Sequence, residues 1–165
     1  MRRFPTGVTV LTVHDGKQIH GMTANSFTSV SLNPTLVLVC INKHNATHTL
    51  VKHAGHFALN ILGEHQEYLA KRFAKQVAQP ADPFADVQHH SAATGAPIFD
   101  ECIAYVDCHL VATHDAGDNT VFIGEVQAAG FGNASDATPL LWLDGKYTSL
   151  RDSAPHTFLF STQTV

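Results

Sequence analysis

The chain has 165 residues, of which 44% are hydrophobic and 15% are charged, a balance that predicts one compact domain with a substantial core. The formal net charge is -4 with ten Lys and Arg residues spread along the chain, which excludes the basic stripe of a nucleic-acid-binding protein. No apolar run approaches the ~20 residues of a membrane-spanning helix, and Met1–Pro5 opens without an apolar signal core. We therefore expect a cytoplasmic protein with no nucleic-acid or membrane partner.

Turn signals divide the start of the chain into strands. Val8–His14 is rich in β-branched residues and ends at Asp15-Gly16, so we expect a hairpin in which Lys17–Ala24 returns antiparallel. Asn33-Pro34 interrupts the chain before Leu36–Asn42. The unbroken apolar run of this last segment predicts a central strand covered on both faces.

Two short helices and a strand are expected next. Asn45–Ala54 contains good helix formers, with its first residue as the cap and Gly55 as the stop. His56–Leu62 is the strand that follows, and Gln66–Lys75 has apolar residues at helical spacing. Residues 76–100 carry three of the seven prolines and little periodicity, so we expect an excursion that can border a binding site.

The second half of the chain is strand-rich. Ile103–Ala112 and Thr120–Ala128 are strand-like and flank a turn at Asp115–Asn119, which predicts a long hairpin. Leu140–Leu143 and Lys146–Leu150 repeat this pattern around a tight turn. Because the strands do not alternate regularly with helices, we expect a mainly β fold: a closed or split β-barrel with short helices rather than a doubly wound sheet.

Residues 21–43 place many small hydroxyl and amide side chains directly before an apolar strand. These neutral hydrogen-bonding groups suit a polar, planar ligand that carries a phosphate. The composition of residues 21–43, taken alone, favours a solvated loop over a ligand-binding site. The order of the surrounding segments, given below, favours the cofactor site.

The residues indicate neither a metal site nor a nucleophile. Twelve histidines are present without an HExxH or Cys/His set, and we interpret His53, His56 and His89-His90 as surface residues. No GxSxG, GxGxxG or P-loop pattern occurs. The cysteines lack CxxC spacing and are expected to be reduced, mostly buried thiols: Cys40, Cys102 and Cys108.

Taken together, six segments in order resemble the flavin reductase-like family with an FMN-binding split β-barrel, which includes the reductase components of two-component flavin monooxygenases. The match covers about residues 2 to 150, in a single domain of residues 1–165 whose C-terminal tail, 153–165, lies beyond it. We expect the tail to pack across a partner subunit. The matching segments are 3–8, 22–34, 57–62, 72–74, 117–126, and 139–142 with 145–147.

The resemblance implies a homodimer that binds one flavin, FMN or FAD, per subunit near the subunit interface. Reduced nicotinamide, from NADH or NADPH, would stack on the flavin ring and deliver hydride to it. The implied enzyme is an NAD(P)H:flavin oxidoreductase that supplies reduced flavin to a partner monooxygenase. No acid, base or nucleophile is needed, since the two nucleotides carry out the transfer and the protein positions them.

The resemblance also assigns residues to the flavin site. Residues 23–26 would contact the isoalloxazine edge and ribityl chain, and residues 29–31 would approach the phosphate. The implied cofactor-binding residues are Thr23, Ala24, Asn25, Ser26, Ser29, Val30, Ser31, Asn42, Lys43, Thr47, His48, Arg72, Phe73, Lys75 and Tyr147. For Arg72 and Lys75 a solvated helix end is an equally open interpretation, and for Tyr147 a plain strand aromatic.

One residue departs from the family pattern. Many of these reductases have Gly-Asp-His where this chain has Gly117-Asp118-Asn119, and the family's histidine lies close to flavin and nicotinamide. Asn119, the one candidate catalytic residue, would position these rings without a titratable group. This departure leaves open a flavin-binding carrier, sensor or scaffold without efficient NAD(P)H oxidation. A separate alternative is reduction of a different acceptor, such as a corrinoid or ferric complex, by the same bound flavin.

Overall fold

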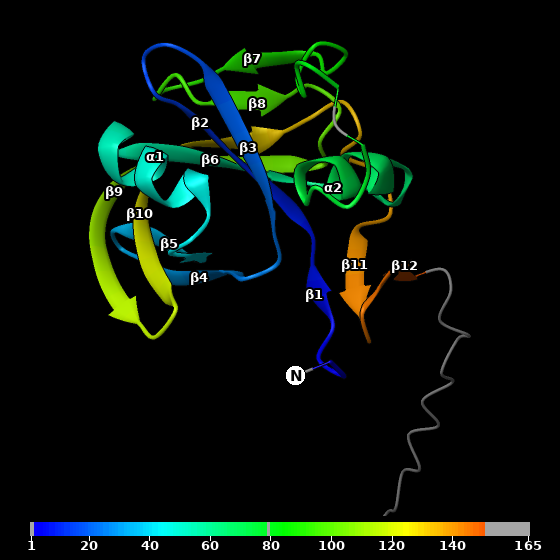
Figure 1. Cartoon of the computed structure of the whole chain (residues 1–165), viewed down its shortest axis with the longest axis horizontal. Helices are drawn as coiled ribbons and strands as arrows, with labels where there is room; N and C mark the ends of the chain where they lie inside the picture. The colour runs from blue at the N-terminus through cyan, green and yellow to red at the C-terminus, as the bar shows by residue number, and fades with distance from the viewer. Residues whose placement is uncertain (1, 79, 151–165) are drawn as a thin grey trace, which may run out of the picture.

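The structure is a computed structural model that describes residues 2–78 and 80–150 (Figure 1). Seven antiparallel strands form its main sheet: β2 (Thr9–His14), β3 (Ile19–Ala24), β4 (Phe27–Leu32), β5 (Thr35–Asn42), β6 (His56–Ile61), β9 (Ala104–Ala116) and β10 (Asn119–Phe131). Their order across the sheet is β3-β2-β6-β9-β10-β5-β4. With its two short helices, this architecture confirms the mainly β fold expected from the sequence.

The main sheet is open between two strands that follow one another in the chain. β3 and β4 occupy its two opposite edges, yet only Asn25 and Ser26 separate them in sequence. The sheet must therefore curl until its edges approach each other, as Figure 1 shows for β3 and β4. Because these two edges are not hydrogen-bonded to one another in a sheet, the barrel is split there.

Two smaller sheets extend the barrel. β1 (Thr6–Gly7), β11 (Leu140–Leu143) and β12 (Lys146–Ser149) form one of them, in the order β1-β11-β12. β7 (His89–Ser91) pairs with β8 (Pro97–Phe99) to form the other. The proline-rich excursion thus contains a short hairpin of its own.

Both predicted helices are present. α1 (Ala46–Ala54) begins at Asn45, whose side chain accepts a hydrogen bond from Thr47 N, and ends at Gly55 with a φ of 72°. Glycine adopts this left-handed conformation without the steric cost of a Cβ. α2 (Glu67–Phe73) follows a single 3₁₀ turn, η1 (Glu64–Gln66). No helix within the described ranges is long and apolar enough to cross a membrane.

Apolar side chains gather on both faces of the sheet. On one face Val51 of α1 packs with Leu11 and other strand residues. On the opposite face α2 and its following segment pack with Val10. β2 is therefore buried on both faces. The prediction of a fully covered strand was wrong for Leu36–Asn42, because β5 lies next to the edge strand and only alternate residues are buried.

Buried polar side chains fasten the excursion to the barrel. Asn60 Oδ1 accepts from Phe99 N at 2.8 Å, and Asn60 Nδ2 donates to Val10 O at 3.1 Å. Asp107 Oδ2 accepts from the backbone N–H groups of Ala93 and Thr94, both at 2.8 Å. Both side chains are 0% exposed, and removing either would leave its backbone partners without these hydrogen bonds.

Four further sequence expectations have different outcomes. The polar run expected to form part of a cofactor site contains β4, and the long hairpin extends beyond its predicted ends to a turn of only Gly117-Asp118. The cysteines are free, as expected, and Cys102 and Cys108 are buried. The expected tail, residues 153–165, lies outside the described residues.

Candidate functional site

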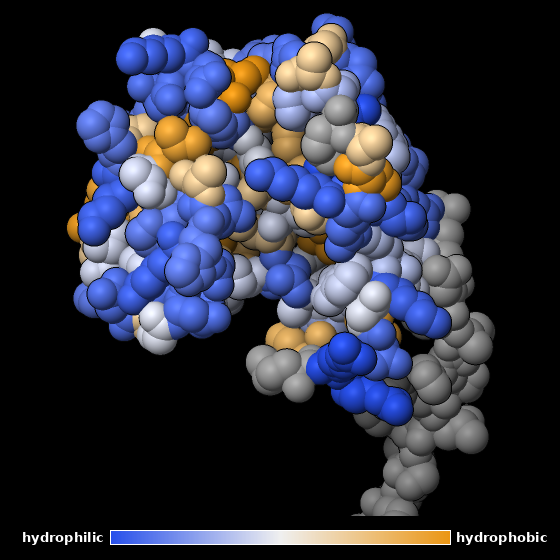
Figure 2. Space-filling view, viewed as in Figure 1, coloured by the Kyte–Doolittle hydropathy of each residue, from blue (hydrophilic) through white to orange (hydrophobic). Residues whose placement is uncertain are grey.

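A cavity of 1060 Å³ opens on the face of the molecule shown in Figure 2, which is hollowed between α1 and α2. Its walls come from His14 and residues 17–23 of the β2–β3 hairpin, 44–47 at the start of α1, 72–75 at the end of α2, and 81–84. Cofactor pockets commonly measure ~300 to 1,000 Å³. The cavity is therefore large enough for a dinucleotide, and residues 81–84 of the proline-rich segment border it.

A second hollow, of 210 Å³, adjoins the cavity and shares Thr23 and Ala74 with it. Trp142 and Tyr147 line it with their rings packed edge to face, 4.8 Å apart between centroids. The Tyr147 hydroxyl donates to Gln76 Oε1 at 3.4 Å, and burial is the main cause that raises the pKa of Tyr147. This hollow thus offers aromatic surface next to a polar cavity.

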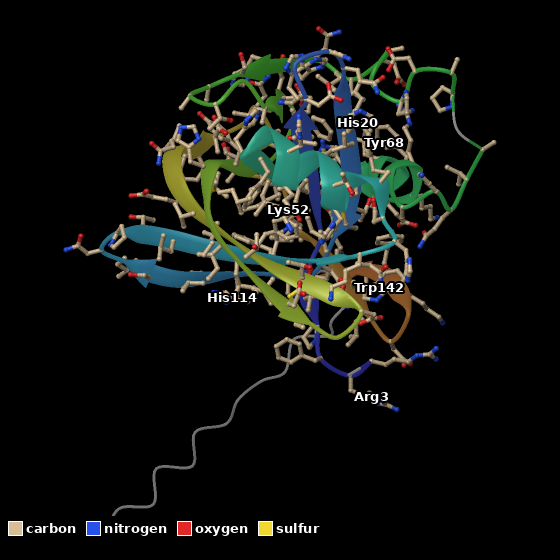
Figure 3. All side chains as sticks on the ribbon, turned by 60° about the vertical axis from the view of Figure 1, so that its left-hand side comes forward. Arg3, His20, Lys52, Tyr68, His114 and Trp142 are labelled. Carbon is tan, nitrogen blue, oxygen red and sulfur yellow. The ribbon has the colours of Figure 1, made fainter. Side chains whose placement is uncertain are left out.

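β3 runs between the two hollows. Figure 3 shows His20 toward one end of this strand and Trp142, on β11, toward the other. Thr23 Oγ1 donates to a backbone carbonyl of α2 at 2.7 Å. Gly21 permits the same close approach, because a Cβ at this position would lie 2.8 Å from the ring of Phe73. Part of the cavity wall is therefore formed where β3 and α2 pack closely.

The structure brings part of the predicted cofactor-binding set together. Those that line the 1060 Å³ cavity are Thr23, Thr47, Arg72, Phe73 and Lys75. Asn25 and Tyr147 line the adjoining hollow together with Thr23. These seven residues come from four separate segments, which the fold brings together.

Arg72 is engaged by the protein itself. Its Nη2 donates to Asp86 Oδ2 at 3.0 Å, its Nη1 donates to Asp86 Oδ1, and the same Nη1 donates to Pro83 O at 3.2 Å. The Asp86 carboxylate raises the pKa of Arg72, whose guanidinium in turn lowers the pKa of Asp86. Arg72 thereby holds residues 81–84 in place as a wall of the cavity.

The other predicted residues line neither hollow: Ala24, Ser26, Ser29, Val30, Ser31, Asn42, Lys43, His48 and Asn119. Ala24 is 5% exposed and belongs to the core. Ser26 Oγ donates to Cys40 O at 2.9 Å, and Lys43 Nζ lies 3.5 Å from a carboxylate oxygen of Asp115. Ser29, Val30 and Ser31 lie on the edge strand β4. Cofactor contacts at these positions stay predictions.

Asn119 and His48 lie at the end of the long hairpin. Asn119 is the first residue of β10, and its Nδ2 donates to Asp118 Oδ1 at 2.8 Å. His48 Nε2 lies within hydrogen-bonding distance, 2.9 Å, of Thr120 Oγ1. Burial, followed by the charge of Lys52, lowers the pKa of His48. The catalytic role proposed for Asn119 stays a prediction.

Sequence reasoning missed the basic side chains on one wall of the cavity. Lys17, His14 and His20 come from the β2–β3 hairpin, and His44 comes from the turn before α1. Their only signal in the sequence is the position of three of them beside the Asp15-Gly16 turn, which does not distinguish a wall from a solvated hairpin tip. Within the part of the chain that the structure describes, no group of three or more His, Cys, Asp or Glu residues is arranged to hold a metal ion.

Comparison with known proteins shows the family of the chain. The model of the "Flavin reductase like domain" matches residues 1–151. A probable flavin reductase of Rhizobium meliloti (strain 1021) is 44% identical over 127 residues, which cover 76% of this chain and 40% of that protein. The chain thus spans less than half of that relative's length.

Two further proteins match over most of both chains. HsaB of Mycobacterium tuberculosis, the reductase subunit of a flavin-dependent monooxygenase, is 35% identical over 149 residues, covering 90% of this chain and 78% of HsaB. The solved structure of the NADH:FAD oxidoreductase SgcE6 of Streptomyces globisporus C-1027 has a TM-score of 0.80 and 37% identity. That match covers 88% of this chain and 86% of SgcE6. The chain therefore belongs to the family of the flavin reductase like domain, whose fold it shares.

Proposed function

We propose that this protein is an NAD(P)H-dependent flavin reductase, which passes a hydride from reduced nicotinamide to FMN or FAD and supplies reduced flavin to a partner monooxygenase in the cytoplasm. One observation carries the proposal: a cavity of dinucleotide size adjoins an aromatic hollow along β3 in a chain of this family. The names of SgcE6 and HsaB support the choice of NADH, flavin and monooxygenase. Three free thiols fit a reducing compartment.

The residues around the two hollows suit a flat ring joined to a phosphate. Trp142 and Tyr147 offer aromatic surface for a ring, and the amide of Asn25 beside them can bond to a ring carbonyl. Thr47 and the other residues at the start of α1 face the larger cavity, where the positive end of the helix dipole and a hydroxyl favour an anion. A flavin therefore fits with its ring toward β11 and its phosphate toward α1.

Positioning is the protein's main contribution to the reaction. When both nucleotides are bound, they supply the redox chemistry, a hydride transfer between their rings. The chain's own residues must hold the two reacting atoms ~3 to 3.5 Å apart. Thr23 and Ala74, the small residues that both hollows share, leave room beside the ring for a second flat group. Backbone N–H groups near the ring would favour its negatively charged reduced form.

The proposal includes a homodimer. On β4, Val30 is 47% exposed and Leu32 is 88% exposed, and the strand is an unpaired edge of the main sheet. An exposed apolar edge strand is a common surface for association.

Light scattering should report a dimer, and the Val30→Lys/Leu32→Lys double variant should shift it to a monomer. Val77→Lys, at a residue 46% exposed beyond α2, should remain dimeric, whereas a monomeric unmodified protein would refute the dimer.

Steady-state kinetics of the purified chain test the activity. NADH or NADPH oxidation should depend on added FMN or FAD, and flavin fluorescence should be quenched on binding. Asn25→Ala should weaken flavin binding, while Asn133→Ala, at a surface residue bonded to Glu101, should not. Absence of flavin-dependent oxidation with either nicotinamide would refute the reductase.

Asn119 is the residue that supports the alternative function, a flavin-binding protein without efficient nicotinamide oxidation. Its amide faces Asp118 and lines neither hollow, so it offers no titratable group to the nicotinamide. Flavin binding without nicotinamide oxidation would indicate a carrier, sensor or scaffold. Oxidation that requires a corrinoid or ferric complex as acceptor would indicate the other candidate. Asn119→His should raise the rate of NADH oxidation if position 119 contacts the rings.

A further inference from the structure

β10 extends past the strand that pairs with its outer side. β9 pairs with β10 from Asn119 to Phe131, whereas β5 pairs with it only from Asn119 to Glu125. In the described part of the chain, no other strand pairs with residues 126–131 on the side away from β9. We call these six residues the β10 edge. Their backbone N–H and C=O groups on the open side are available to a further strand.

The β10 edge lacks most of the features that protect an exposed strand from pairing. Its sequence, Val-Gln-Ala-Ala-Gly-Phe, contains no charged residue and no proline, and natural proteins use both to keep edges unpaired. A bulge at Gln127 is one protective device that is present, and it leaves residues 128–131 in regular pairing with β9. The composition therefore fits a strand that is covered by another one.

Apolar groups lie on both faces of the β10 edge. A Cβ at Gly130 would lie 2.9 Å from the Tyr105 hydroxyl and 3.0 Å from two carbons of its ring, so that ring covers the strand on one face. Phe131 follows Gly130 and projects from the opposite face, where it is 81% exposed. A strand that pairs with the β10 edge would therefore find apolar surface on either face.

The open side of β10 begins at the β4–β5 hairpin. Leu36 of β5 pairs with Glu125, and Thr35 pairs with Leu32 of β4. The turn of this hairpin therefore lies beside the first residue of the β10 edge, and Leu32 there is 88% exposed. A strand that pairs with the β10 edge would occupy the same row of the sheet as β5 and would end at this turn.

One segment outside the described residues has the composition of such a strand. Residues 156–161, which we call the tail segment, read His-Thr-Phe-Leu-Phe-Ser and contain no proline and no Asp, Glu, Lys or Arg. Phenylalanine and threonine are enriched in strands. The tail segment and the β10 edge thus match in length and in apolar character.

The register of the strands limits the distance that the chain must cover to bring the two together. A path across paired or adjacent residues runs in this order: Ser149, Leu140, Leu62, Ile61, Ala104 and Phe131. With paired Cα atoms ~5 Å apart and one residue step of ~3.8 Å, Ser149 lies within about 24 Å of Phe131. Residues 150–156 can span up to about 25 Å when extended. The chain's own tail segment can therefore reach the β10 edge.

A tail segment that arrives by this path runs antiparallel to β10. It meets the sheet at Phe131, the last residue of β10, and continues toward the β4–β5 hairpin. Every strand pair of the main sheet is antiparallel, so this pairing extends the existing pattern. The connection to β12 holds the segment at an effective concentration on the order of millimolar, which favours the chain's own tail over that of another copy.

We propose that residues 156–161 form a strand that pairs antiparallel with the β10 edge of the same chain and closes this side of the barrel. The interface goes beyond the proposed reductase, because it holds whether or not the protein oxidises NADH. The competing occupant of the edge is the tail of a partner subunit.

Hydrogen exchange of the full chain, read by mass spectrometry, tests the pairing from the side of the tail. Leu159→Pro removes a backbone N–H from the middle of the tail segment, so amide exchange in residues 126–131 should become roughly tenfold faster. Gln163→Pro, beyond the tail segment, is the matched control and should leave that exchange unchanged. Equal exchange of residues 126–131 in the unmodified chain and in Leu159→Pro would overturn the proposal.

The same measurement tests the pairing from the side of the sheet. Ala129→Lys/Phe131→Lys places two charges at exposed positions of the β10 edge, and amide exchange in residues 156–161 should become faster. The matched control, Val111→Lys/Thr113→Lys, adds two lysines at exposed positions of β9, opposite the part of β10 that β5 covers. Exchange in residues 156–161 that is as fast in the unmodified chain as in the edge variant would overturn the proposal.

An equimolar mixture of Leu159→Pro and Ala129→Lys/Phe131→Lys shows whose tail pairs with the edge. Neither variant can form the pairing within its own chain, but the intact edge of the first could accept the intact tail segment of the second. The two versions of residues 126–131 differ in mass, so their exchange is read separately. We expect the intact edge to stay in fast exchange after mixing. Restored slow exchange would assign the edge to a partner subunit's tail and overturn the pairing within one chain.

Discussion

Gly21→Ala is expected to affect stability and nucleotide binding together, because Gly21 lies where β3 meets α2 under the cavity. A Cβ there would lie 2.8 Å from Cδ1 and Cε1 of Phe73 and 3.1 Å from Cζ of Phe84. Ordinary contacts of a Cβ begin at 3.4 Å, so both rings must retreat. Phe73 is 6% exposed and packs against Phe84 and Phe99, with ring centroids 5.0 Å and 5.7 Å away. Little free space remains for that movement.

The magnitude follows from two opposing effects. Overpacking of a core costs about 1 to 3 kcal/mol, while replacement of a glycine by alanine reduces the entropy of the unfolded chain and contributes about 0.4 to 1 kcal/mol in the opposite direction. We expect Gly21→Ala to lower the free energy of unfolding by about 1 to 2 kcal/mol. The displaced Phe73 ring would also enter the cavity, which should weaken dinucleotide binding severalfold.

Urea unfolding followed by fluorescence, together with a flavin titration, measures both effects. Gly7→Ala is the matched control, since a Cβ at Gly7 would have nothing within 4 Å and its φ is not positive; it should leave stability unchanged or slightly raised. If Gly21→Ala proves as stable as Gly7→Ala, the packing argument is refuted. If stability falls while flavin affinity is unchanged, the flavin does not use this cavity.

Three further predictions concern groups outside the cavity. Asp107→Ala should lower the free energy of unfolding by about 3 kcal/mol in urea melts, because two backbone N–H groups and the Thr94 hydroxyl lose a charged acceptor that is itself 0% exposed. Burial is the main cause that lowers the pKa of His48, and nearby lysine charges lower it further. As the pH drops below ~6.5, His48 therefore binds a proton more readily in the unfolded chain than in the folded one, and stability falls. His48→Gln should make the decrease of Tm between pH 7 and pH 5 smaller. Burial raises the pKa of Cys102 to about 11 and of Cys108 to about 12, so a thiol reagent at pH 8 should modify them only after unfolding, as mass spectrometry would show.

Turn chemistry made the order of elements predictable. Asp15-Gly16, Gly55 and Gly145 each mark a reversal or a helix end, and each has a positive φ in the structure. Such signals are local, because the backbone conformation at one residue decides them. The sequence did not predict β4, because this strand depends on contacts with a neighbouring strand rather than on a local signal. Its residues are held mainly by pairing with β5, and four of the six are exposed, so no apolar alternation marks the strand.

The residues of the site were only partly predictable, because the tertiary fold determines which side chain each polar group meets and hydrogen-bonds. Ser26 and Lys43 have the chemistry of ligand-binding residues, yet the fold brings Ser26 to the backbone of Cys40 and Lys43 to Asp115. Nothing in the sequence pairs these groups. The resemblance to a family predicts the general position of the site, and the fold decides which polar groups line the two hollows.

Arg72 and Lys75 show that the fold can give two neighbouring cations different partners. They are three residues apart and both suit a phosphate, so the sequence gives them the same role. The structure separates them, because residues 81–86 return over α2 and bring Asp86 to Arg72, while Lys75 lies past the helix end and forms no ion pair in the described chain. A cation that is neutralised by the protein shapes a wall, and one that is not neutralised can bind a ligand. The position of one carboxylate therefore decides which of these two cations forms an ion pair within the described chain.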